Sequence, residues 1–454
     1  MKKTIILCFA TLFFVQAKPL AKSNGYRGIW YHNEVIDEPY RYKYSGGLGT
    51  FPQTHMPTAY YSKEANKTFF CYGGTLMGHN QMMIMISYYD HATGMVPRPR
   101  VLIDKKTDDP HETATLTLDD KGFIWIFSNA HGAKRPAFVH KSTKPYSIDE
   151  FKLVKEQNFS YMQPWFFPGK GFLLLHTLYS PGRFLFSVNS SDGVDWGPPK
   201  PIARFGLGHY SVSWQHDSSV GLAFNYHPDP GGLNARTNLY YMQTQDWGKS
   251  WITAAGMAVD TPLLQTHNVA MIHDYQAEGL LVYLKNLEFD EMGRPVILYL
   301  TSKGWQPDPA FGPRTWNTAQ WNGKTWDIRP VTVSDNNYDF GSLYIESDGT
   351  WRIIAPTDPG PEPNVPGGEV VMWTSRDSGK TWLKAKRLTR NSPREHSYVR
   401  KPWNAQPDFY AFWADGEALH LSESSLYFTN RNGDHVWRLP EIMTGEFAKP
   451  EVAW

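Results

Sequence analysis

The segment Thr244-Gln245-Asp246-Trp247-Gly248-Lys249-Ser250-Trp251 decides the fold. It fits the pattern Ser/Thr-x-Asp-x-Gly-x-Ser/Thr-Trp, an Asp-box, in which the aspartate caps backbone amides, the glycine takes positive φ and the tryptophan covers the edge of a sheet. A second Asp-box occupies residues 375–382, a degenerate copy residues 190–196 and a shortened relative residues 321–326. Each copy predicts a hairpin turn between two antiparallel strands.

The spacing of these turns predicts a repeated four-stranded unit. The copies that begin at Ser190 and Thr244 are 54 residues apart, which suits a propeller blade of four antiparallel strands. About 430 residues follow the N-terminal signal described below, and that length divided by the period gives seven to eight units. Helical periodicity is hard to find, which argues against an α/β barrel. We therefore expect an all-β fold, a seven-bladed β-propeller in which residues 426–428 complete a blade begun by the N-terminus.

The composition fits many short strands and leaves aromatic rings to line a carbohydrate-sized groove. Phe, Trp and Tyr make up 15% of the 454 residues, and the chain has 37 glycines and 33 prolines. The formal net charge is only +1, so there is no bulk electrostatic case for binding nucleic acid or an anionic membrane. An acidic ligand must be bound by local clusters of Arg, Lys and His.

The N-terminus has the features of a secretory signal peptide. Lys2 and Lys3 precede an apolar run over residues 4–15, and Val15-Gln16-Ala17 resembles a small-residue cleavage site. The run is too short for a stable membrane span. We expect a signal peptide over residues 1–17, extending to about residue 22, and a single catalytic propeller over residues 23–454. The mature protein is then periplasmic or secreted by a bacterium; a retained N-terminal anchor is the alternative.

The cysteines exclude two kinds of stabilisation. Cys8 lies inside the signal, so its removal leaves Cys71 alone. One cysteine cannot form a disulfide framework or a cysteine-based zinc site.

Residues 108–135 provide the candidate catalytic hairpin. Strands at residues 113–118 and 123–128 flank a tight turn at residues 119–122. Antiparallel pairing brings His111, His131 and Arg135 to the same edge of the sheet. Loop ends are where a β-protein commonly places its chemistry. The structural alternative is two loop histidines with ordinary hydrogen bonds.

Later blades repeat an aromatic residue or histidine at a strand end, often with an arginine just beyond. Propeller strands expose their ends on the two faces, so such residues converge around the central channel. The residues that follow this pattern are Tyr161, Tyr179, Arg183, Tyr210, Tyr226, His227, Arg236 and His267.

Several segments together resemble one family. They are GYRGIWY (25–31), YSGGLGT (44–50), KTFFCYGGT (67–75), FNYHP (224–228), RTNLYY (236–241), YDFGSLY (338–344) and FYAFWADG (409–416), with the hairpin of His111 and His131. The chain is similar over nearly its whole mature length to the secreted sialidase-like, BNR-repeat propeller lyases that include the ulvan lyases. The resemblance implies β-elimination at a uronic acid linked to sulfated rhamnose. The partner it implies is an anionic polysaccharide, and we expect a monomer.

The chemistry of β-elimination selects the candidate residues. Removing the C5 proton beside a carboxylate requires a base near neutral pKa and a cation that neutralises the carboxylate. His111 and His131 match the histidine pair of such lyases, which is about 20 residues apart. Tyr226 and Arg236 complete the predicted catalytic set by type and blade position.

Other residues remain open at this point. Tyr210, Tyr179, Arg183 and Tyr161 are substitutes for the tyrosine and arginine, and Tyr179, Arg183, Tyr210, His227 and His267 are the expected substrate-binding residues. We expect no cofactor in catalysis; the resemblance admits a structural divalent metal, but no ligand set can be assigned, since His267 and His273 lack the i, i+4 spacing of a helical zinc site.

Two alternatives come from the same fold. In a related propeller family that releases L-rhamnose from glucuronate of arabinogalactan, a single histidine on the opposite face is implicated, and His55 is similarly placed here. The other alternative is a non-catalytic glycan-binding propeller, since the arginine triad and Tyr/Glu pair of a true sialidase cannot be assigned.

Overall fold

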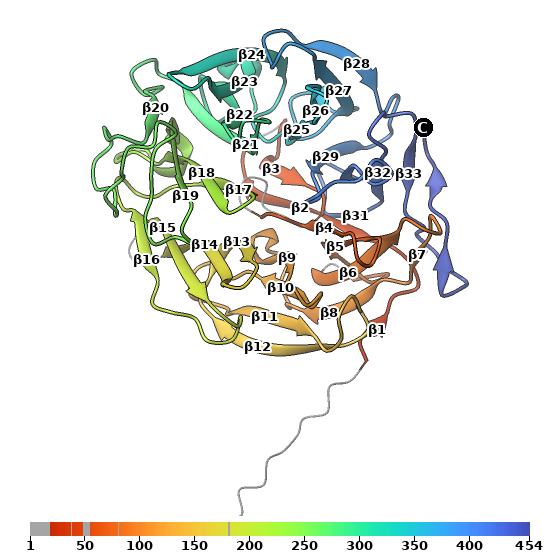
Figure 1. Cartoon of the computed structure of the whole chain (residues 1–454). Helices are drawn as coiled ribbons and strands as arrows, with labels where there is room; N and C mark the ends of the chain where they lie inside the picture. Colours follow the sequence, from red (N-terminus) through yellow and green to blue (C-terminus); the bar gives the residue numbers. More distant parts are fainter. Residues whose placement is uncertain (1–18, 38, 49–54, 80, 180–181) are drawn as a thin grey trace, which may run out of the picture.

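The computed structural model describes residues 19–37, 39–48, 55–79, 81–179 and 182–454. The predicted signal peptide at residues 1–17 lies outside these residues. The described chain is all-β, and its sheets follow one another around a ring in sequence order (Figure 1). No helix in the described part of the chain is long and apolar enough to cross a membrane.

Five sheets contain four antiparallel strands each, with consecutive strands as neighbours. The first three sheets contain β9 (Ala114–Leu118), β10 (Ile124–Ser128), β11 (Ala137–Ser142) and β12 (Phe151–Gln157); β13 (Ser160–Phe167), β14 (Gly171–Tyr179), β15 (Arg183–Ser190) and β16 (Lys200–Ala203); and β17 (Ser211–His216), β18 (Ser219–Tyr226), β19 (Thr237–Thr244) and β20 (Met271–His273). The other two contain β21 (Leu281–Phe289), β22 (Pro295–Ser302), β23 (Arg314–Trp321) and β24 (Trp326–Ser334); and β25 (Ser342–Ile345), β26 (Trp351–Asp358), β27 (Glu369–Ser375) and β28 (Leu383–Arg387).

Two larger sheets complete the ring. The five-stranded sheet contains β29 (Glu395–Arg400), β30 (Ala411–Gly416), β32 (Leu426–Thr429), β33 (Val436–Arg438) and β35 (Glu451–Val452). The eight-stranded sheet contains β1 (Ala21–Lys22), β2 (Gly28–Val35), β3 (Tyr42–Gly46), β4 (Ala59–Ser62), β5 (Lys67–Gly74), β6 (Met83–Asp90), β8 (Arg100–Asp104) and β31 (Ser422–Ser424). A small pair, β7 (Val96–Pro97) with β34 (Phe447–Ala448), and three 3₁₀ turns, η1 (Pro110–Glu112), η2 (Gly232–Ala235) and η3 (Pro309–Phe311), account for the other elements.

The blade number differs from the prediction. Six sheets, five of four strands and one of five, have the form of propeller blades among the described residues. A β-propeller with four antiparallel strands per blade is therefore confirmed, whereas seven blades are not. The eight-stranded sheet departs from the simple form because β2 joins it to β3 and to β31.

The N-terminus and C-terminus meet, but not through the predicted strand. Residues 426–428 lie in β32, which pairs with β30 and β33 of its own sheet. Strand pairing between the two ends of the chain is made instead by β31, where Ser424 pairs with Gly28 of β2, and by β34, which pairs with β7. The prediction placed closure one strand too late, because β31 and β32 are separated by a single residue.

The Asp-boxes form the expected turns. Asp246 accepts hydrogen bonds from the backbone N–H groups of Lys249 and Ser250, and Gly248 has φ +75°. Asp377 accepts from Thr381 in the same way, and Asp192 caps the degenerate copy. These turns lie between the third and fourth strands of their blades, so they fix the sheet edges rather than the channel.

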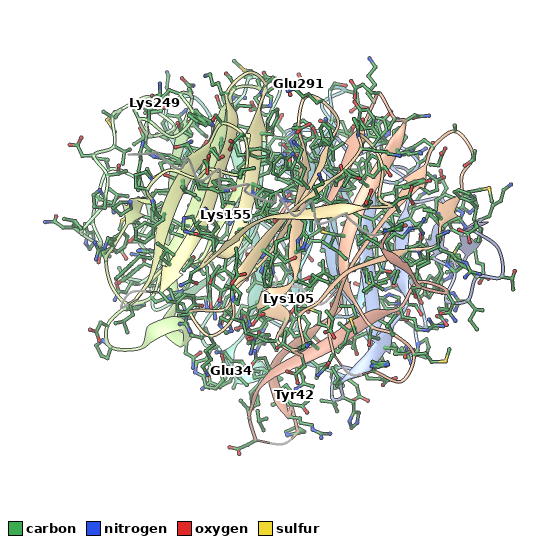
Figure 2. All side chains as sticks on the ribbon, turned by 90° about the horizontal axis from the view of Figure 1, so that it is seen from below. Glu34, Tyr42, Lys105, Lys155, Lys249 and Glu291 are labelled. Atoms are coloured by element: carbon green, nitrogen blue, oxygen red, sulfur yellow. The ribbon has the colours of Figure 1, made fainter. Side chains whose placement is uncertain are left out.

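The first strand of each regular blade lines the centre. Figure 1 shows β9, β13, β17, β21 and β25 around the axis and β12, β16, β20, β24 and β28 at the rim. Residues that precede the inner strands meet at one mouth of the channel, and residues that follow them surround a cavity at the other. Figure 2 shows Glu34 of β2 and Tyr42 of β3 at one end of the molecule and Glu291 at the opposite end.

Candidate active site

The two histidines of the candidate hairpin lie in contact at one channel mouth. His111 belongs to η1 just before β9, and His131 follows β10; the pairing of Ala114 with Ser128 returns the chain to the same edge. The imidazole centroids are 3.9 Å apart and the rings are inclined by 15°. The predicted strands and the predicted meeting of the two histidines are thus observed, while their catalytic roles stay predictions.

Asp109 joins the pair and was not identified from the sequence. Its Oδ1 atom lies 2.6 Å from Nδ1 of His111, and its Oδ2 atom lies 2.7 Å from Nδ1 of His131. Burial opposes ionisation of this carboxyl, but the hydrogen bonds from both histidines outweigh burial and hold the pKa of Asp109 well below its usual range. The Asp-Pro-His sequence, which places a capping aspartate ahead of the η1 turn, is the signal that would have identified it.

The two histidines differ in their surroundings. His111 is buried, and burial lowers the pKa of its imidazole, although hydrogen bonding to Asp109 acts in the opposite direction. Its Nε2 atom lies 3.3 Å from the hydroxyl of Tyr44. The side chain of His131 is 28% exposed, so it is the member of the pair that a substrate reaches more easily.

A second layer of charges supports Asp109. Arg135, which the sequence placed at this edge, pairs with Glu112 and lies 3.8 Å from Asp109. The Glu112 carboxylate is fully buried and is also 3.1 Å from Nζ of Lys105. Arg135 therefore has a structural ion-pair partner, and its predicted position beside the histidines is observed.

Two tyrosines and one arginine from the next blade complete the cluster. The hydroxyls of Tyr161 and Tyr179 are 2.9 Å apart, and Nε of Arg183 donates to the Tyr179 hydroxyl at 3.3 Å. The ring centroid of Tyr179 is 5.9 Å from that of His131, and that of Tyr161 is 5.9 Å from that of His111. Burial is the main cause that raises the pKa of Tyr179 to about 12, partly offset by Arg183.

Tyr226 and Arg236 occupy different positions from those predicted. The Tyr226 hydroxyl donates to Gln276, and its ring packs against Phe205 and Tyr240 in the blade core. The pairing of β18 with β19 shifts its register between Phe224 and Tyr226, an irregularity that the sequence did not indicate. The structure therefore offers Tyr161 and Tyr179, the substitutes considered above, as the tyrosines beside the histidines.

Arg236 is held in an aromatic cage. It is 1% exposed, its guanidinium carbon lies 4.8 Å from the ring centroid of Tyr210 and 4.7 Å from that of Tyr283, and Nη2 donates to the Tyr338 hydroxyl at 3.1 Å. These contacts make Arg236 a poor match for the predicted carboxylate partner. Arg183 is the arginine beside the histidine pair.

The predicted binding residues separate into two groups. Tyr210 packs edge-on against Tyr161, and the buried His227 packs on Tyr210, so both extend the floor of the site. His267 lies in the loop between β19 and β20, where its side chain is 75% exposed and pairs with Asp274. The structure thus places Tyr210 and His227 with the cluster and His267 in an outer loop.

The β2–β3 hairpin contributes residues that were not expected in the site. Tyr44 stacks on Tyr338, and Lys43 contacts Glu34 at 2.6 Å. Burial is the main cause that lowers the pKa of Lys43 to about 8, and the charge of Arg236 contributes. Sequence patterns did not indicate these residues; they belong to the site because the hairpin lies across the channel mouth.

His55 lies below the floor of the site. It is fully buried, and its ring centroid is 5.9 Å from that of Tyr161. The space beside it, about 10 Å³, is bounded in part by Lys285 and Arg400. A sugar ring cannot enter a space of this size.

The opposite mouth of the channel contains a cavity of about 920 Å³. The turns that follow the inner strands line it, including residues 215–217 and 288–291. Lys401 pairs with Glu288 at its wall. This cavity contains neither histidine of the pair.

One group of side chains in the site has the spacing of a metal site. Among the described residues, one group of His, Cys, Asp and Glu side chains is compact enough to hold an ion, namely Asp109, His111 and His131, with one atom of each within 4.8 Å of the others. The Nδ1 atom of each histidine and the two carboxylate oxygens of Asp109 are joined by hydrogen bonds. The three side chains thus form one hydrogen-bonded network, and the expectation of catalysis without a cofactor stays a prediction.

The comparisons with known proteins agree with this fold. Residues 204–334 match the model of a BNR repeat-containing family, and no curated protein matches the chain. A solved ulvan lyase of polysaccharide lyase family PL25 superposes with a TM-score of 0.69 at 16% identity, covering 90% of this chain and 96% of its own. Another structure of a PL25 ulvan lyase, bound to -[GlcA(1-4)Rha3S]-, gives a TM-score of 0.68 at 16% identity, with coverage of 90% and 96%.

A third solved structure, polysaccharide lyase Uly1, superposes with a TM-score of 0.60 at 10% identity, covering 94% of this chain and 99% of its own. The expected resemblance to BNR-repeat propellers of the ulvan lyase type is confirmed in fold. At these identities the likeness speaks for architecture alone, so function depends on the site described above.

Proposed function

We propose that this protein is a polysaccharide lyase that cleaves a uronate-containing polysaccharide by β-elimination. The observation that carries the proposal is the stacked pair of His111 and His131, joined by Asp109 and lying beside Arg183 and Tyr179. Catalytic bases, acids and cations converge in this way where proton transfer is performed. The fold shared with polysaccharide lyases supports the same reaction class.

Each of these residues has a separate role in the proposed reaction. Arg183 neutralises the uronate carboxylate and thereby stabilises the negative charge that develops when C5 loses its proton. His131, the more exposed imidazole, takes the C5 proton at Nε2. Electrons of the C5–H bond form the C4–C5 double bond, and the C4–O4 bond breaks. Tyr179, which is protonated at neutral pH because its pKa is about 12, donates its proton to the departing O4.

The substrate is proposed to be ulvan-type, with glucuronate or iduronate linked to sulfated rhamnose. The sequence resemblance supports this, and a structural neighbour is bound to -[GlcA(1-4)Rha3S]-. Buried cations in the floor, Lys43 and Arg236, add positive potential for an anionic chain. We further propose that the protein acts as an exported monomer without a catalytic cofactor. We also propose that residues 23–454 form a single domain, in which β4, β5, β6 and β8 of the eight-stranded sheet are the seventh blade.

The test is incubation with ulvan while absorbance of the new 4,5-unsaturated uronate is recorded. We expect a rise with the unmodified protein and none with His131→Ala. Release of L-rhamnose from arabinogalactan without this absorbance would indicate the glycosidase alternative through His55, although complete burial of that residue argues against it. Binding of ulvan with no product from either glycan would identify a glycan-binding propeller.

A further inference from the structure

We infer that Asp109 is the positioning residue of the histidine pair: its one carboxylate fixes both imidazoles in the same tautomer, with Nδ1–H toward Asp109 and Nε2 left for the reaction. The inference rests on the proposed function for its kinetic consequence only. The tautomers themselves follow from contacts between the three side chains.

The protonation of both rings follows from the chemistry of a carboxylate. An ionised aspartate accepts hydrogen bonds and cannot donate them. Nδ1 of His111 and Nδ1 of His131 lie 2.6 Å and 2.7 Å from separate oxygens of Asp109. Both nitrogens must therefore carry the proton in these bonds, and in a neutral imidazole this leaves Nε2 without one.

The position of the carboxylate is itself fixed. Oδ1 of Asp109 accepts the backbone N–H of His111 at 3.0 Å, where it caps η1. Nη2 of Arg135 lies 3.8 Å from Oδ2, and Arg135 is anchored by the fully buried Glu112. Backbone and ion pair thus hold Asp109 from two directions, so it has little freedom to release either ring.

The stacking of the rings determines where their Nε2 atoms point. The ring centroids are 3.9 Å apart and the ring planes are inclined by 15°, so the two imidazoles lie face to face and nearly parallel. If Nδ1 of each points to Asp109, Nε2 of each points away from it, toward the side occupied by tyrosines. One residue therefore sets the direction of both Nε2 atoms, including that of His131, the proposed base.

The test uses Asp109→Asn, which preserves shape but changes the donors. An asparagine has one accepting oxygen and one donating amide, so one of the two Nδ1 atoms must become an acceptor and its ring must move the proton to Nε2. We expect ¹⁵N NMR, with signals assigned to His111 and His131, to show both as Nδ1–H imidazoles in the unmodified protein and at least one of them as an Nε2–H imidazole in the variant. Asp108→Asn, an exposed neighbour with the same change of charge, should leave both tautomers unchanged.

The kinetic arm measures kcat and KM on ulvan. We expect Asp109→Asn to lower kcat about 10³-fold to 10⁴-fold with little change in KM, by analogy with the wrong-tautomer variant of a serine-protease triad. A structural role alone would lower the melting temperature without moving the tautomer. Detection of an Nε2–H tautomer for either ring in the unmodified protein, or of two Nδ1–H rings in a folded Asp109→Asn protein, overturns the inference. Because NMR needs no substrate, it decides the inference even if the protein has no lyase activity.

Discussion

At the residue scale, the sequence identified some members of the site and missed the one that links them. His111 and His131 could be predicted because a tight hairpin joins them, so local pairing alone decides that they meet. Asp109 lies two residues before His111, yet its contact with His131 depends on side-chain directions that a pattern does not contain. Arg236 was preferred to Arg183 for its blade position, but its burial between Tyr210 and Tyr283 is a property of two neighbouring blades together.

The role of Arg183 can be tested by substitution. Arg183→Ala should lower kcat/KM on ulvan by about 10²-fold to 10³-fold, because removing a preorganised group that stabilises developing charge has an effect of that size. Arg183→Lys should restore part of the activity by returning the charge without the planar fork. Steady-state kinetics provides the measurement, and Arg204→Ala, an exposed arginine nearby, is the matched control. Equal activity of Arg183→Ala and the unmodified protein would exclude this role.

The buried Glu395 gives the protein a pH-dependent stability. Burial raises the pKa of Glu395 to about 9, so the folded state keeps it protonated while the unfolded state ionises above about 4.5. Its contribution is present below the unfolded pKa and is lost as pH rises from 4.5 through 9, at up to about 1.4 kcal/mol per pH unit. Glu395→Gln resembles the protonated form and can still accept from the N–H of Glu362.

Urea unfolding of both proteins at pH 5 and pH 8 measures this effect. We expect the midpoint of Glu395→Gln to exceed that of the unmodified protein at pH 8 by a larger margin than at pH 5. The same margin at both pH values would show that the carboxyl does not titrate abnormally in the folded state.

At the scale of elements, turns were predicted better than sheet membership. The hairpin expected at residues 113–118 and 123–128 is observed as β9 and β10, with boundaries one residue shorter at each N-terminal end. Its turn chemistry is local, and so is that of the Asp-boxes. One partner of β2 is not local, because β31 comes from the far end of the chain and no motif marks it.

The Asp-box supplies a stability prediction. Asp246→Ala removes the acceptor for two backbone N–H groups and for the hydroxyls of Ser250 and Thr244. By analogy with loss of a helix cap, we expect the free energy of unfolding to fall by about 1–2 kcal/mol. Chemical denaturation measures the change, and Asp260→Ala, an exposed aspartate in the following loop, should have little effect. A loss no larger than that of the control would mean that the turn does not depend on its aspartate.

At the scale of the whole molecule, the ring separates two different channel mouths. One gathers histidines, tyrosines and arginines, and the other opens into the cavity of about 920 Å³. The propeller class could be predicted from a period and a turn motif, because repetition is visible along the chain. Which residues of different blades share a channel mouth could not be predicted, since this depends on where each inner strand begins relative to the axis.

A whole-protein prediction concerns metals. Since hydrogen bonds join Asp109, His111 and His131 to one another, and arginine supplies the neutralising charge, dialysis against EDTA should leave kcat on ulvan unchanged. The control is the same enzyme dialysed without chelator, followed by addition of divalent cations. Loss of activity that Zn²⁺ or Ca²⁺ restores would contradict a metal-free reaction.

The absorbance of unsaturated uronate during incubation with ulvan shows whether this protein is a lyase that acts through His111 and His131. We expect a steady rise with the unmodified protein, and no rise with folded His131→Ala or His111→Ala, each checked by its melting temperature. A flat trace with the unmodified protein across ulvan and other uronate polysaccharides, or an undiminished rise with folded His131→Ala, would contradict it.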